Sequence, residues 1–393
     1  MDSPFRWFEH RLKQLEEDGL RRTRRSVTST GHGWCRIDGH SLCDFASNDY
    51  LGLAADPRLR KAAHDAVDDV GTGARASPLV SGHTNWHDQL EQRLARFEEA
   101  EAALLFPTGY AANVGTIAAL VDEQDVILTD RLNHASLIDG CRLSGARMRV
   151  IRHADIAQYE RELDKSAARH RLIVTDGVFS MDGDLAPLTE LAELAERFDA
   201  WLLVDEAHGT GVFGHHGRGV CELQGVRSPR VIRVGTLSKA VGSQGGFVVG
   251  PQPLIDWLWN RARTQVFSTA LAPPSCAAAL RAIDIIEQTP EMRLRLHRRC
   301  DDVRARLTDA GLPVPDNATG PIIPIVLGDP ERTVRAAQML FEDGFLVAAI
   351  RPPTVPRNTA RLRLSLSLVH GDDDIDAMTA TLIDVVRSQM QHK

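Results

Sequence analysis

A lysine and an aspartate stand where the sequence could build a catalytic site. Lys239 lies in the stretch Val231–Gly250 and Asp205 in Trp201–Val212, and each stretch begins with a short apolar run typical of a buried parallel strand. Open α/β sheets place their ligands at the carboxyl ends of such strands, so we expect both side chains to point into one cleft. A carboxylate that keeps a pyridine nitrogen protonated and a lysine that bonds an aldehyde carbon are the groups that pyridoxal phosphate (PLP) requires.

Each of these two residues also has a simpler interpretation. A lysine after a strand is usually solvated, and an aspartate at a strand end often caps the next helix. The neighbouring residues favour the catalytic interpretation, because His208 follows Asp205 by three positions and Thr236 and Ser238 flank Lys239.

The composition is that of an ordinary globular protein. Its 393 residues are 43% hydrophobic and 25% charged, and the net charge of −7 argues against nucleic acid as a partner. The N-terminal stretch is too charged for a signal peptide, and no apolar run reaches the length of a membrane span. The cysteines show neither a CxxC motif nor zinc-like spacing, so we expect free thiols, no metal site and a cytoplasmic location; they are Cys35, Cys43, Cys141, Cys221, Cys276 and Cys300.

Three parts of the chain differ in their pattern. Residues 1–50 begin with an amphipathic helix over Ser3–Gly19 and continue into a hairpin. In residues 51–288 strand-like and helix-like segments alternate, with Trp257–Thr269 as one expected helix, and this predicts an α/β domain whose mostly parallel sheet is covered on both faces. Residues 289–393 indicate a smaller α+β domain.

Two glycine-containing segments are candidate ligand surfaces. Ala102–Gly115 is typical of a strand, a turn at Pro107-Thr108-Gly109 and a helix that opens at about Tyr110. The unpaired N–H groups of such a helix start bind phosphate, although a plain βα turn has the same pattern. Gly71–Gly82 is expected to be a loop, either flexible or a backbone surface for a ligand.

Five longer motifs can be compared with those of known families. They are LNHASL (Leu132–Leu137), VFSMDGD (Val178–Asp184), VDEAHGTGV (Val204–Val212), TLSK (Thr236–Lys239) and AIRPPTVP (Ala349–Pro356). In this order they resemble the α-oxoamine synthase family, which comprises PLP enzymes of fold type I. The resemblance runs from about Arg21 to the C-terminus and implies a large PLP-binding domain followed by a smaller domain.

The resemblance implies how the cofactor would be held. Lys239 would bond PLP covalently and later remove the α-proton of the substrate, while Asp205 would pair with the ring nitrogen. His134 would stack on the ring, and His208 would hydrogen-bond the ring hydroxyl oxygen. The other cofactor contacts would come from the pocket residue Ser180 and from a phosphate site made of Gly109, Tyr110, Thr236, Ser238 and, from a neighbouring subunit, Thr269. The active unit is therefore expected to be a homodimer.

Substrate contacts are implied for a second set of residues. Arg363 matches the position that grips the amino-acid carboxylate, where a planar guanidinium can bind with two parallel hydrogen bonds. Arg351 is a further carboxylate candidate, and Arg21 and Thr354 match substrate-contacting positions, although Arg21 could equally be a surface charge. The set is completed by Asn48 and His134.

The resemblance also implies a reaction. Its members condense an amino acid with an acyl thioester and release CO2, and the segments IRPPTVP and TARLRLSLSLVH most resemble members that use L-alanine and a pimeloyl thioester, carried by CoA or a carrier protein. A sister enzyme that uses glycine and acetyl-CoA is the nearest alternative, because the two amino acids differ by one methyl group. The chain departs from many members at Ser77-Pro78, where they have Ser-Arg; proline removes a backbone N–H donor from this loop, which leaves the choice of acyl donor open.

Two interpretations from other classes agree less well with the sequence. A serine hydrolase could use Ser180, His208 and Asp205, but the sequence has no G-x-S-x-G elbow, and this interpretation leaves Lys239 without a role. A PLP-free scaffold subunit is disfavoured because Lys239, Asp205, His134 and His208 are all present.

Overall fold

The computed structural model describes residues 4–18 and 20–391. The chain divides into two compact units: the larger holds Asn48–His297, and the smaller holds the described residues up to Ser47 together with those from Arg298 onward. Ser3 and Gly19, the expected ends of the first helix, lie outside the described residues. No helix formed within residues 4–18 and 20–391 is long and apolar enough to cross a bilayer.

The larger unit is built on a seven-stranded sheet with the order β4-β10-β9-β8-β7-β5-β6. Only β10 runs antiparallel to its neighbours among these strands, and the pairs from β9 to β6 are parallel. The expected mostly parallel α/β sheet is thus confirmed. The strands are β4 (Ala102–Phe106), β5 (Val126–Asp130), β6 (Arg147–Ile151), β7 (Arg171–Asp176), β8 (Trp201–Asp205), β9 (Val231–Thr236) and β10 (Gly246–Gly250).

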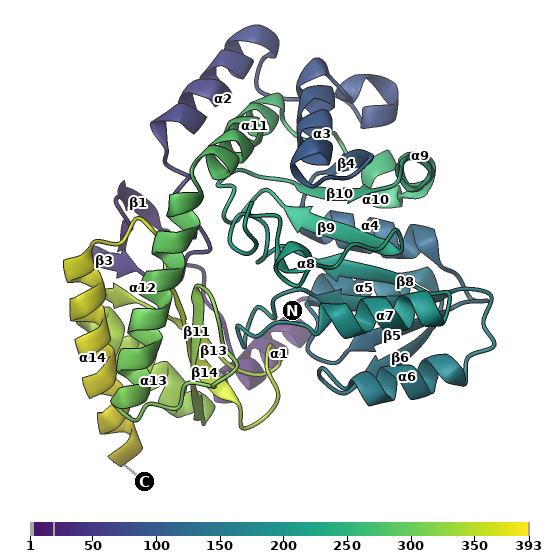
Figure 1. Ribbon diagram of the computed structural model, residues 1–393. Helices are drawn as coiled ribbons and strands as arrows, with labels where there is room; N and C mark the ends of the chain where they lie inside the picture. The colour runs from purple at the N-terminus through teal and green to yellow at the C-terminus, as the bar shows by residue number, and fades with distance from the viewer. Residues whose placement is uncertain (1–3, 19, 392–393) are drawn as a thin grey trace. The chain divides into compact units, whose positions relative to one another are not determined.

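Helices lie on both faces of this sheet (Figure 1). On one face α4 packs against α5, and on the other α6 packs against α7. The helical elements of the larger unit are α2 (Pro57–Val70), the π-helical turn η1 (Pro78–Gly82), α3 (Asn85–Phe97), α4 (Gly109–Leu120), α5 (Ala135–Ser144), α6 (Ile156–Asp164), α7 (Leu188–Arg197), α8 (Val220–Leu223), α9 (Gln252–Arg261), α10 (Arg263–Val266) and α11 (Pro273–Gln288).

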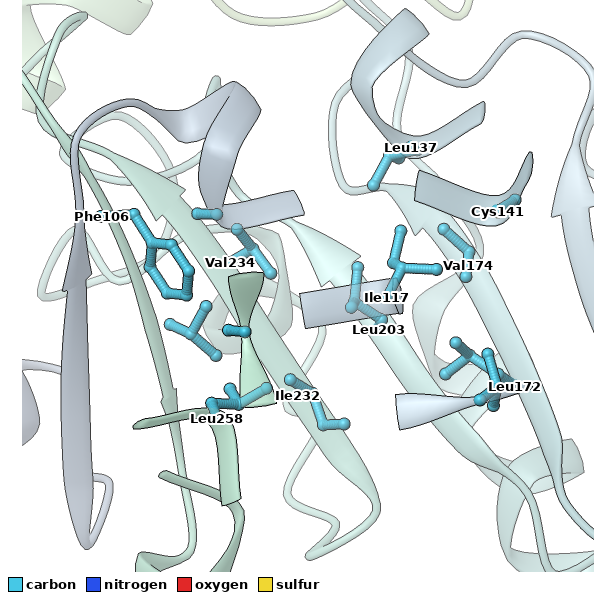
Figure 2. Packing of buried hydrophobic residues seen from close by; sticks show 14 of the residues in the cluster. Phe106, Ile117, Leu137, Cys141, Leu172, Val174, Leu203, Ile232, Val234 and Leu258 are labelled. Atoms are coloured by element: carbon cyan, nitrogen blue, oxygen red, sulfur yellow. The ribbon is translucent and has the colours of Figure 1, made fainter. Parts of the chain in front are cut away.

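An apolar core holds the strands of this sheet in place. Side chains from β4, α4, β8 and α9 meet in it, among them Phe106, Ile117, Leu203 and Leu258 (Figure 2). Burying a side chain of this size stabilises the fold by about 1.5–3 kcal/mol. The strand ends that carry the polar residues are therefore fixed by the packing behind them.

The expected helix over Trp257–Thr269 is wrong in its extent. Helix α9 ends at Arg261, α10 ends at Val266, and Thr269 lies beyond both. Ala262 interrupts them with an extended backbone, φ −72° and ψ 96°, and its side chain is buried in the core cluster. Alanine favours helix, so this break follows from packing and is not visible in the local sequence.

The loop expected over Gly71–Gly82 also contains a helical turn, η1. The backbone N–H of Gly82 donates to the carbonyl oxygen of Ser77 at 3.0 Å, and this bond closes the turn. A Cβ atom at Gly82 would lie 2.1 Å from the carbonyl oxygen of Ala76, so this closure requires glycine.

The smaller unit combines two sheets with flanking helices. A four-stranded sheet has the order β1-β2-β3-β12, and a three-stranded antiparallel sheet has the order β11-β14-β13. The parallel pairing of β12 with β3 joins segments three hundred residues apart and was not expected from the sequence. The elements are α1 (Arg6–Glu17), β1 (Thr28–Gly31), β2 (Trp34–Ile37), β3 (His40–Asp44), α12 (Pro290–Asp309, which begins in the larger unit), β11 (Ile322–Gly328), α13 (Pro330–Glu342), β12 (Phe345–Leu346), β13 (Ala348–Ile350), β14 (Ala360–Ser365) and α14 (Asp372–Gln391).

Candidate active site

The carboxyl ends of β8 and β9 bring the central residues together. The two strands pair in parallel, Asp205 is the last residue of β8, and Lys239 follows the end of β9 by three positions. His208 lies in the segment after β8, and its Nε2 is 2.8 Å from the Lys239 Nζ. The amine thus has a fixed partner at the sheet edge.

The other ring nitrogen of His208 is held by a buried tyrosine. Its Nδ1 is 2.7 Å from the Tyr50 hydroxyl oxygen, and that hydroxyl donates to Asn48 Oδ1 at 3.1 Å. Because the phenol proton is used on Asn48, we assign the proton of a neutral His208 to Nδ1, which donates to the phenol oxygen. Nε2 then faces Lys239 as an acceptor, so the imidazole orients the lysine.

Asp205 is buried and held by two donors. Its Oδ1 accepts the backbone N–H of Ala207 at 2.8 Å, and its Oδ2 accepts the side-chain amide of Asn113 at 2.6 Å. Hydrogen bonds from N–H donors stabilise the charged form of a carboxylate. The carboxylate is therefore fixed in the orientation in which it could meet a cationic ring nitrogen.

Asn113 and Ser136 connect Asp205 to His134, and sequence reasoning missed both. Asn113 also donates to the Ser136 Oγ at 2.9 Å, and that hydroxyl is 2.7 Å from His134 Nδ1. The one signal for Asn113 is that it is the only amide side chain in the mostly apolar helix GYAANVGTIAAL. Since α4 is buried on this side, a polar side chain there needs a partner.

His134 stands at the N-terminus of α5 as its capping residue. Its backbone N–H donates to Asp176 Oδ2 at 2.7 Å, and burial lowers the pKa of the imidazole. A neutral ring results, which suits packing against an aromatic face. Asp176 ends β7 opposite Asp205, and burial together with the nearby Asp205 raises its pKa well above the usual range.

The turn from β4 into α4 forms an anion site with the end of β9. Helix α4 begins at Gly109, one residue earlier than expected, and Thr108 caps it by accepting the backbone N–H of Ala111 at 3.0 Å. The first N–H groups of a helix have no acceptor within it. A Cβ at Gly109 would lie 3.2 Å from the Thr236 Oγ1, so the two residues are adjacent, and that hydroxyl is 2.8 Å from the Ser238 Oγ.

Three further candidates in the larger unit lie around these groups. Tyr110 is exposed, and its hydroxyl donates to Asp139 at 2.5 Å. Ser180 is half-buried in the loop after β7, and Thr269 is exposed in the irregular segment after α10.

The other substrate candidates belong to the smaller unit. Arg363 lies in β14, is buried, and donates to the Ser365 Oγ at 3.0 Å. Arg21 pairs with Glu16 at 2.6 Å, and Arg351 donates to the backbone oxygen of Arg21 at 3.4 Å. Thr354, the fourth candidate, accepts a hydrogen bond from Arg22 at 3.4 Å. The unit therefore groups Arg21, Arg351 and the Thr354 loop at one place, with Arg363 in the sheet.

The groups in the larger unit fit pyridoxal phosphate, the cofactor that the resemblance implies. A lysine amine could bond its aldehyde carbon, a carboxylate held by two donors could face its ring nitrogen, and a helix start beside two hydroxyls could bind its phosphate. Because Gly109 has no side chain, the Thr236 side chain can lie against that helix start; a Cβ at Gly109 would come within 3.1 Å of it.

Comparisons with known proteins agree with this arrangement. The model of the family "Aminotransferase class I and II" matches residues 41–379. The chain is 48% identical over 371 residues to an 8-amino-7-oxononanoate synthase of Aromatoleum aromaticum, covering 94% of this chain and 96% of that protein. It is 46% identical to 8-amino-7-oxononanoate synthase 2 of Bacillus subtilis, covering 95% and 96%.

Among solved structures, a serine palmitoyltransferase of Sphingomonas wittichii superposes with a TM-score of 0.93 at 32% identity, covering 99% of this chain and 98% of that chain. The fold is therefore the PLP-dependent transferase fold of type I. The chain belongs to the class I and II aminotransferase family, within the group of the 8-amino-7-oxononanoate synthases.

Proposed function

We propose that the chain catalyses the reaction after which its relatives are named, the synthesis of 8-amino-7-oxononanoate in biotin biosynthesis. The substrates would be L-alanine and a pimeloyl thioester, and the products would include CO2 and the free thiol carrier. The observation that carries the proposal is the contact of Lys239 Nζ with His208 Nε2 at 2.8 Å, beside an Asp205 that two N–H donors hold. The identity of 48% to a synthase selects the reaction within the family.

Pyridoxal phosphate, when bound, would supply a ring that takes up the negative charge left at the substrate α-carbon. Lys239 would hold the cofactor and then move the α-proton, and His208 would keep its amine in place. Asp205, oriented by Asn113, would keep the ring nitrogen protonated. A neutral His134 would cover the ring face without repelling a cationic ring.

Further contacts are proposed for the phosphate and the pocket. The backbone N–H groups of Gly109 and Tyr110, with the hydroxyls of Thr236 and Ser238, would bind the phosphate, and Ser180 would line the pocket.

The substrate carboxylate would be bound by Arg363, whose guanidinium can form two parallel hydrogen bonds. Arg21, Arg351 and Thr354, which group together in the smaller unit, would contact the acyl substrate. Asn48, whose side-chain oxygen accepts a hydrogen bond from the Tyr50 hydroxyl, would contact the substrate near Lys239.

The active form would be a homodimer, in which Thr269 of the partner subunit completes the phosphate site. In support, Phe267, two positions before Thr269 in the sequence, is 71% exposed, and Trp257 and Leu143 are also exposed. These three line one hollow of about 1260 Å³ in the larger unit, and apolar surface of this kind usually binds a partner. Phe267→Asp should convert the dimer to monomers in light scattering and weaken PLP binding.

The described cysteines are all free and buried. This supports, as a proposal, a reducing and therefore cytoplasmic setting.

Two competing amino-acid substrates need a direct test. Glycine differs from alanine by one methyl group, which is worth about 1–3 kcal/mol in a pocket. L-Serine is favoured by the TM-score of 0.93 to a serine palmitoyltransferase, although the 32% identity to that protein is below the 48% identity to a synthase.

The deciding experiment is a visible spectrum of the PLP-loaded protein, titrated separately with L-alanine, glycine and L-serine. Pimeloyl-CoA is then added, with thiol release and product mass as readouts. A spectral response to L-alanine, followed by thiol release and the mass of 8-amino-7-oxononanoate, would support the proposal. If only glycine or only L-serine gave a spectral response and product, the chain would have the activity of a related enzyme instead. The absence of a visible PLP absorbance band would refute the proposed chemistry.

A further inference from the structure

A histidine outside the groups described so far lies between two buried carboxylates. His153 Nδ1 is 3.1 Å from Asp130 Oδ1, and its Nε2 is 2.7 Å from Asp184 Oδ2. Asp130 is 2% exposed and Asp184 is 5% exposed. A carboxylate accepts hydrogen bonds, so the ring must donate from both nitrogens, which only the imidazolium form does. His153 is therefore a cation that compensates two buried charges.

Each carboxylate belongs to a segment that leads to a candidate active-site residue. Asp130 ends β5, and its Oδ1 accepts the backbone N–H of Leu132 at 2.8 Å, which shapes the turn into His134. Asp184 closes the loop that carries Ser180. In that loop the backbone N–H of Phe179 donates to the carbonyl oxygen of Asp184 at 3.0 Å.

Additional contacts make the connection rigid. The ring of Phe179 meets the His153 ring edge-on at a centroid distance of 4.5 Å. The residue after His153, Ala154, donates its backbone N–H to Asp130 Oδ2 at 2.8 Å. The segment after β6 is thus fastened to the end of β5 and to the loop after β7, on the edge of the sheet where Asp205 also lies.

We propose that His153 is a positioning residue, whose imidazolium joins the Ser180 loop to the strand end that precedes His134. The inference deepens the proposed function, since it rests on Ser180 and His134 serving the cofactor. Charge-assisted hydrogen bonds to buried carboxylates are strong and directional, so their loss should loosen both segments. His153 is not among the residues proposed to contact the cofactor or the substrate.

The test compares His153→Leu with a double variant, His153→Leu/Asp184→Asn, in the PLP-free protein. Amide hydrogen exchange is measured by mass spectrometry on peptides that cover residues 178–185 and 130–136. In both variants we expect exchange in these peptides to rise about ten- to a hundredfold, as for loss of a charged hydrogen bond, with little change in α7. PLP affinity should fall by about tenfold.

The double variant separates positioning from charge compensation. Asp184→Asn removes one of the two buried negative charges, so the double variant should be more stable than His153→Leu. It cannot restore the hydrogen bonds that join the Ser180 loop to Asp130. Unchanged exchange in His153→Leu, or full recovery of exchange and PLP affinity in the double variant, would overturn the proposal. His153→Gln, which is neutral and can donate from its nitrogen end only, also loses the bridge between the two carboxylates and provides the same readout if His153→Leu does not fold.

A matched control is His170→Leu. His170 stacks on Trp201 at the opposite edge of the same sheet, with the ring centroids 5.0 Å apart, and should leave both peptides unchanged. Because exchange is measured without PLP, a failed synthase assay would leave this test intact, and the two proposals can fail separately.

Discussion

Replacing Asn113 by leucine should weaken PLP binding while leaving the fold in place. The Asn113 amide donates to Asp205 at 2.6 Å, and the two side chains are only 2% and 5% exposed. A hydrogen bond to a charged group contributes about 1.5–3 kcal/mol, so its loss corresponds to roughly a ten- to 150-fold rise in the PLP dissociation constant. Leucine has the same branching and the same number of side-chain heavy atoms as asparagine, which limits the cost in packing.

A second substitution at the same position tests the electrostatic reasoning. Asn113→Asp would place two carboxylates about 2.6 Å apart. At an effective dielectric constant of about 20, two negative charges at roughly 3 Å repel by about 5 kcal/mol, so one of the carboxylates must bind a proton. PLP binding to this variant should therefore depend more steeply on pH than binding to Asn113→Leu.

The assay is a titration of PLP-free protein with PLP, followed by visible absorbance, with far-UV circular dichroism as the check of folding. Thr116→Val is the matched control. Thr116 lies on the same helix and is buried, and its hydroxyl has no partner among the residues that the structure describes. Dissociation constants within twofold of wild type for both Asn113 variants would refute the role of Asn113.

Three further predictions follow from single contacts. Burial alone would lower the pKa of His153, but Asp130 and Asp184 raise it to about 10, above its ordinary 6.5, so its contribution to stability is complete below pH 6.5 and is lost as the pH rises through about 10. Urea titrations should therefore show that the unfolding free energies of wild type and His153→Gln differ less at pH 9 than at pH 7. After a discount for solvent screening, we expect this difference to shrink by about 1–2 kcal/mol. A difference that stays constant with pH would contradict the prediction. Tyr50→Phe removes the oxygen at 2.7 Å from His208 Nδ1 and should lower kcat about two- to tenfold in steady-state kinetics. Because it leaves a buried donor without its acceptor, it should also lower the unfolding free energy by about 1–3 kcal/mol in urea titrations. Arg363→Lys should raise KM for L-alanine about tenfold with a smaller change in kcat, since lysine cannot form the two parallel hydrogen bonds, and an unchanged KM would exclude Arg363 from substrate binding.

The sequence by itself determined the class of fold and the central residues. The alternation of strand and helix patterns predicts the parallel sheet, because apolar periodicity is a local property of each segment. Asp205 and Lys239 could be identified since each directly follows an apolar strand, and parallel strands end at one edge. His208 was identified from the same motif as Asp205, and His134 from the separate motif LNHASL.

Only the tertiary structure decided which groups support those residues. Asn113 meets Asp205 across 92 positions, and Tyr50 meets His208 across 158. The break at Ala262 and the pairing of β12 with β3 are equally non-local. Periodicity and turn chemistry describe neighbours in the chain, whereas a buried polar group takes the partner that packing brings to it, and that partner can come from anywhere in the chain.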